Sequence, residues 1–265
     1  MLPSFLIMFR ESLEVSLVVG IILSFLIKTK QTKYNDTVYI GVISGIFVSL
    51  IVGYLFVALK AEFEGYVEQV FEGVTMLVGA ALITTMIFWM MKQRKLSEQL
   101  HAKLSQHIET ANVVGLFLLA FVSVLREGIE TVIFLSAASN LTNGLSLVGI
   151  CLGLGLAILL GYLIFVMSIK IKIKYFFTFT SVLLILFAAG LVSYGVHELI
   201  EAGLINPVVE NIYDINHILS DKSDLGLILK GLFGYNGNPA LVETISYFAY
   251  ITFVAVCWNL KYFKK

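Results

Sequence analysis

The sequence predicts an all-α integral membrane protein with seven transmembrane helices. Hydrophobic residues make up 58% of the 265 residues and charged residues only 14%. With a mean hydropathy of +0.92, this composition is atypical of a soluble globular domain. Seven stretches are long enough to cross a hydrocarbon core of about 30 Å, which takes roughly 20 helical residues. They lie at about 2–27, 37–59, 70–91, 112–138, 145–169, 176–199 and 240–260.

Individual stretches carry features of their own. The first has no basic n-region and contains charges, so we do not expect a cleaved signal peptide. The second and fifth contain Gly41/Gly45 and Gly149/Gly153, a spacing that is typical of close helix packing. Trp89 ends the third stretch and an aromatic run begins the sixth, as in an interfacial aromatic belt. The first and fourth stretches carry charged motifs.

The distribution of basic residues predicts an N-terminus outside and a C-terminus inside. The segments after the first, third, fifth and seventh stretches hold 13 of the 18 Lys and Arg residues. The opposite side holds only Lys60, Lys222 and Lys230. The positive-inside rule places the first group in the cytoplasm, and an odd number of spans gives the same orientation.

The pattern R-E-x-x-E occurs twice, at Arg10–Glu14 and Arg126–Glu130, in spans that run in opposite directions. We therefore expect a single membrane domain over 1–265 that contains a 3+3 inverted repeat plus one helix. The repeat halves are about 1–95 and 110–202, followed by an outer loop at 203–239 and the seventh helix at 240–260. Within the loop, 223–233 reads as a short interfacial or re-entrant helix, and the G-Y-N-G-N-P run after it as a turn.

The two motifs predict a metal site. On translocon-type scales, a charged residue costs about 2.5–3.5 kcal/mol at the middle of a membrane helix, so both motifs are expected to face each other rather than lipid. On each helix the two glutamates share a face and the arginine reaches the second one. The resulting net charge of −2 favours a hard cation. The site residues are Glu11, Glu14, Glu127 and Glu130, with Arg10 and Arg126 supporting. The alternative is that both motifs are only structural ion pairs.

A second group of acidic residues is expected at the outer surface, where eleven acids face three bases. Such a surface concentrates cations, although an ordinary solvated face is the alternative. The residues expected at this outer mouth are Glu68, Glu72, His197, Glu198 and Glu201.

The doubled motif resembles that of the oxidase-dependent iron permeases of fungi and their bacterial counterparts. The stretches 71–90, 188–203 and 232–250 also resemble bacterial members, so the resemblance extends over nearly the whole chain. It implies that the four motif glutamates handle iron, that the arginines support them, and that acidic residues of the outer mouth deliver the ion. It also implies a separate extracytoplasmic partner, either a multicopper oxidase or an iron-delivery protein.

We expect a permease of the plasma or inner membrane that imports Fe²⁺ or Fe³⁺ into the cytoplasm. Iron is its substrate, and we expect no permanently bound cofactor and no nucleic-acid partner. The charge of −2 matches Fe²⁺, whereas the association with oxidases points to Fe³⁺. Whether copies assemble into a homo-oligomer in the surrounding lipid stays open. The alternatives are a membrane-embedded, carboxylate-bridged metalloenzyme, an importer of another hard or borderline divalent metal, a scaffold subunit, and a proton- or sodium-coupled carrier of an organic solute.

Overall fold

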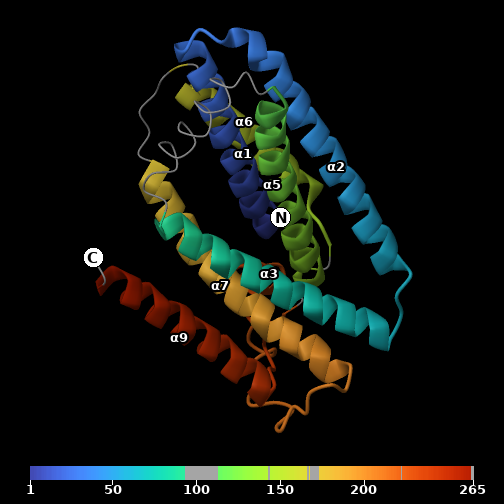
Figure 1. The fold of residues 1–265 in the computed structure, drawn as a ribbon. Helices are drawn as coiled ribbons and strands as arrows, with labels where there is room; N and C mark the ends of the chain where they lie inside the picture. The colour runs from blue at the N-terminus through green and yellow to red at the C-terminus, as the bar shows by residue number, and fades with distance from the viewer. Residues whose placement is uncertain (93–112, 143, 166, 168–172, 222, 264–265) are drawn as a thin grey trace.

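A computed structural model describes residues 1–92, 113–142, 144–165, 167, 173–221 and 223–263. Helices dominate this part of the chain, and no strand occurs in it (Figure 1). The helices are α1 (Leu2–Lys28), a 3₁₀ turn (Thr32–Tyr34), α2 (Asn35–Ala61), α3 (Tyr66–Lys92), α5 (Val113–Leu141), α6 (Leu147–Phe165), α7 (Ile173–Glu201), α8 (Asp224–Phe233) and α9 (Leu241–Phe263).

Five helical segments are long and apolar enough to cross a membrane, which confirms the all-α membrane class. They are Thr32–Ala61, Tyr66–Phe88, Leu147–Phe165, Thr180–Glu201 and Leu241–Asn259. The helices α1 and α5, with 27 and 29 residues, are also long enough to cross a membrane. They differ from the five because each contains the three charged residues of a motif.

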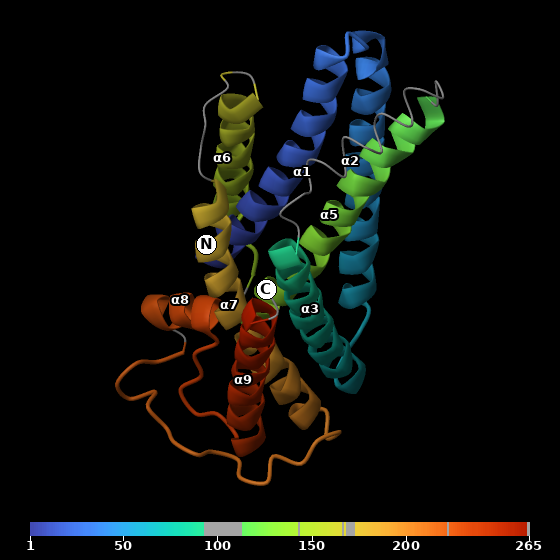
Figure 2. The same ribbon diagram turned by 60° about the vertical axis from the view of Figure 1, so that its left-hand side comes forward.

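The long helices pack in pairs. α1 lies along α6, α2 along α5 and α3 along α7, while α1 crosses α5 and α9 lies on α7. Figures 1 and 2 show α1, α2, α5 and α6 as one group, with α3, α7 and α9 as a second group beside it. The largest buried apolar cluster joins the two groups, with Ile7 of α1, Met76 of α3, Phe134 of α5 and Leu191 of α7 among its members.

Glycines allow the closest helix contacts, as the sequence predicted for α2 and α6. A Cβ atom on Gly153 of α6 would lie 2.6 Å from the Phe5 carbonyl oxygen of α1. A Cβ atom on Gly41 of α2 would lie 2.8 Å from the Phe117 carbonyl oxygen of α5. Both distances are far inside van der Waals contact, so each pair of backbones can approach this closely only where a side chain is missing.

The short helix α8 packs against α7. It begins at the cap Ser223, whose hydroxyl accepts a hydrogen bond from the Gly226 N–H at 3.0 Å, and it ends at Gly234 with a left-handed φ of +68°. A Cβ atom on Gly190 of α7 would lie 2.6 Å from the Gly234 Cα. Gly190 precedes the end of α7 at Glu201 by about three helical turns, or roughly 16 Å. The carboxyl end of α8 therefore lies about three turns along α7 from the end of that helix at Glu201.

Candidate metal site

The first motif lies on a face of α1 that is turned inward. Arg10 is 1% exposed and Glu11 is 2% exposed. Arg10 Nη1 lies 3.0 Å from Glu11 Oε1, and Arg10 Nη2 lies 2.7 Å from Glu14 Oε1. The expected contact to the second glutamate is therefore present, and a contact to the neighbouring glutamate accompanies it.

The second motif repeats this arrangement on α5 with one difference. Arg126 contacts Glu127, and Arg126 Nε lies 3.5 Å from Glu130 Oε1. The Glu127 side chain is 3% exposed, but that of Arg126 is 49% exposed. The two arginines, which share the same sequence spacing, thus have different surroundings.

Three of the four motif carboxylates come together where α1 crosses α5. Glu11, Glu14 and Glu127 each offer one oxygen atom, and these three atoms lie within 4.8 Å of one another. The Oε2 atoms of Glu11 and Glu127 are buried and have no hydrogen-bond partner among the described residues. An unpaired buried carboxylate oxygen is unfavourable, and a hard cation bound among the three carboxylates would remove that penalty. Glu130 does not belong to this group of three.

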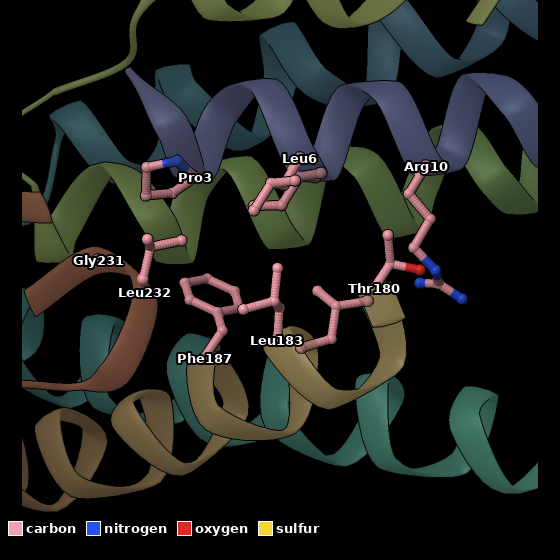
Figure 3. A pocket seen from close by; sticks show the side chains of 10 residues that line it. Pro3, Leu6, Arg10, Thr180, Leu183, Phe187, Gly231 and Leu232 are labelled. Atoms are coloured by element: carbon pink, nitrogen blue, oxygen red, sulfur yellow. The ribbon is translucent and has the colours of Figure 1, made fainter. Parts of the chain in front are cut away.

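A small cavity reaches the first motif from the side of α7 and α8. It has a volume of about 20 Å³, which is room for about one water molecule. Figure 3 shows Arg10 of α1 extending toward Thr180 of α7, with Leu6, Phe187 and Leu232 along the rest of the wall. The cavity is too narrow for a hydrated ion, and its lining is mainly apolar.

The residues expected at the outer mouth lie on two helices that pack together, α3 and α7. Glu72 of α3 pairs with Lys60, whose Nζ is 2.7 Å from Glu72 Oε1 and 2.5 Å from Asn140 Oδ1. Glu68 is exposed on the first turn of α3. His197, in the last turns of α7, contacts Glu201 at 3.2 Å.

A polar cavity of about 520 Å³ adjoins His197 and Glu201. Its wall also includes Asn236 and Glu243, which the sequence had not singled out as site residues. Glu243 is only 2% exposed, and its Oε1 lies 2.9 Å from His197 Nδ1. For Glu243, the sequence signal was an acidic residue in the first turn of a helix, whereas the run containing Asn236 reads only as a turn.

Comparison with known proteins shows which protein family this chain matches. The model of the iron permease FTR1 family matches residues 1–264. A ferrous iron permease EfeU from Yersinia pestis is 35% identical over 258 residues, covering 95% of this chain and 90% of that protein. The ferrous iron permease EfeU from Escherichia coli O157:H7 is 33% identical over 267 residues, covering 98% and 96%. No solved structure matches the chain significantly.

Membership follows from the length of these matches. They run through both motifs and through all the helices that the structure describes. A permease with several apolar helices is a multi-pass membrane protein, and it is a transporter rather than an enzyme. The chain belongs to the iron permease FTR1 family.

Proposed function

We propose that this permease imports Fe²⁺ into the cytoplasm through a site formed by both R-E-x-x-E motifs. The observation that carries the proposal is the group of three carboxylate oxygens of Glu11, Glu14 and Glu127 within 4.8 Å. Glu130 completes the set as an adjacent carboxylate, and Arg10 and Arg126 hold the glutamates in place. Fe²⁺ balances the net charge of −2, and the named relatives are ferrous iron permeases.

The proposal includes seven spans, with the N-terminus outside, and a 3+3 inverted repeat. In such a repeat, α1, α2 and α3 correspond to α5, α6 and α7. The pair α1/α6 then corresponds to the pair α5/α2, and the pair α3/α7 corresponds to itself. These are the pairs that pack together. Gly73 and Gly195 support the same relation, because a Cβ atom on either would lie within about 3.0 Å of the other's carbonyl oxygen.

Iron would enter from the outer mouth, where Glu68, Glu72, His197, Glu198 and Glu201 lie in or near the outer turns of α3 and α7. An inside-negative membrane potential favours entry by about 2.3 kcal/mol per charge per 100 mV. A separate extracytoplasmic oxidase or iron-delivery protein is the partner that we propose on this side.

Uptake of radioactive iron into proteoliposomes under an inside-negative potential tests the proposal. Fe²⁺ and Fe³⁺ are supplied separately to wild type, Glu14→Gln, Glu127→Gln and the exposed control Glu62→Gln. We expect wild type to prefer Fe²⁺ and the two motif variants to lose about 100-fold in uptake. Even residues that only hydrogen-bond to a metal ligand change metal affinity or activity by about 10- to 100-fold when they are mutated. Thermal unfolding checks that each variant is folded. Normal uptake by both folded motif variants would contradict the site.

A further inference from the structure

The side chain of Glu243 is fixed on both sides. Its Oε1 lies 2.9 Å from His197 Nδ1, and its Oε2 accepts a hydrogen bond from Asn236 Nδ2 at 2.9 Å. The Asn236 amide is itself oriented, because its Oδ1 accepts a hydrogen bond from the Asn238 N–H at 3.1 Å. The amide donor on one oxygen and the imidazole on the other leave Glu243 little freedom in its buried position.

This arrangement determines which ring nitrogen of His197 faces the cavity. An ionised carboxylate only accepts hydrogen bonds, so Nδ1 of His197 must donate to Glu243. A divalent ion that binds at Nε2 would displace the proton of that nitrogen, while Nδ1 keeps its proton toward Glu243. Tyr194 packs edge-on against the same ring, with centroids 6.2 Å apart. The ring is therefore held with Nε2 directed away from Glu243.

Nε2 of His197 meets a second carboxylate inside the polar cavity. It lies 3.2 Å from Glu201 Oε1, and the Glu201 side chain is 51% exposed. Gln69 of α3 donates to the other Glu201 oxygen, Oε2, at 3.3 Å. Both His197 and Glu201 line the cavity of about 520 Å³. A histidine whose far nitrogen is held by a buried carboxylate is the usual arrangement behind a metal-binding imidazole.

We propose that Glu243 and Asn236 are positioning residues that hold His197 so that its Nε2, together with Glu201, captures the incoming divalent ion. The captured ion then moves on to the three carboxylates at the crossing of α1 and α5. A purely structural contact between α7 and α9 would also pair His197 with Glu243. It would not, however, require Nε2 to face a cavity beside an exposed carboxylate.

A double-mutant cycle separates positioning from structural support. Fe²⁺ uptake is measured as a function of concentration for wild type, Glu243→Gln, His197→Asn and the double variant. We expect Glu243→Gln to raise the half-saturating Fe²⁺ concentration about tenfold at an unchanged maximal rate. In the His197→Asn background the same change should have no further effect, because Glu243 acts through His197.

The matched control is Glu210→Gln, which removes the same charge from the wall of the same cavity. It should raise the half-saturating concentration by less than about twofold, and its effect should add to that of His197→Asn. Asn236→Ala keeps the carboxylate and should reproduce the effect of Glu243→Gln in weaker form. Additive effects of Glu243→Gln and His197→Asn would overturn the inference, as would a loss confined to the maximal rate.

Because iron import is itself proposed, a measurement without transport is needed. Co²⁺, whose visible absorption responds to imidazole ligation, is titrated into the purified full-length protein. The wild-type transition should be missing in His197→Asn and shifted to about tenfold higher Co²⁺ in Glu243→Gln. If wild type transports no iron but shows this pattern, import fails and the positioning holds. If wild type transports iron and His197→Asn leaves the Co²⁺ spectrum unchanged, only the inference about His197 fails.

Discussion

Two arginines at the same position of the R-E-x-x-E pattern have different surroundings. Arg10 is almost completely buried, with Glu11 and Glu14 as its partners. Arg126 makes the same kind of contacts, but half of its side chain is exposed. Removing one partner of a buried ion pair leaves an uncompensated buried charge, and this penalty is smaller where the side chain is only half buried.

We therefore expect Arg10→Gln to destabilise the protein more than Arg126→Gln. The buried change should lower the free energy of unfolding by about 3–5 kcal/mol, which is typical of a broken buried pair. The change at Arg126 should have a smaller effect, because half of that side chain is not buried against the protein. Thermal unfolding of both variants in detergent, at one pH and ionic strength, gives the comparison. Equal losses would show that the two arginines are equally buried in the membrane protein.

At the scale of the elements, the proposed metal site depends on how closely α1 and α5 are held. Each of these helices is backed by a partner that packs through glycines, α6 behind α1 and α2 behind α5. The charged stripes of α1 and α5 are thereby turned toward each other. The proposed site thus depends on four helices, although only two of them carry its carboxylates.

Two glycines of α6 allow a matched test of this packing. A Cβ atom on Gly153 would lie 2.6 Å from the Phe5 carbonyl oxygen, whereas one on Gly155 would meet nothing within 4 Å. Gly153→Ala should destabilise the fold by about 1–3 kcal/mol through overpacking. Gly155→Ala should be neutral or stabilising by up to about 1 kcal/mol, because alanine is the better helix former. Thermal unfolding measures both, and equal effects would contradict the close contact between α1 and α6.

For the whole molecule, local periodicity was enough to predict the helices and the pairing of Arg10 with Glu14, since both depend on residues close in sequence. It could not show that Glu130 lies outside the group of three carboxylates, or that Arg126 is half exposed. Both depend on the angle at which α1 crosses α5. The contacts of Glu243 with His197 and Asn236 were likewise hidden, because they require α9 and the segment after α8 to fold back onto α7.

The orientation of the whole molecule in the membrane gives the last prediction. Lys28, Lys30 and Lys33 surround the turn between α1 and α2, so the positive-inside rule places this turn in the cytoplasm. Single cysteines are introduced after Cys151 and Cys257 are changed to serine. A membrane-impermeant maleimide should label Glu210→Cys in cells with an intact inner membrane, and exposed Thr32→Cys only after that membrane is permeabilised. The reverse labelling pattern would contradict the expected topology, with the N-terminus outside and the C-terminus inside.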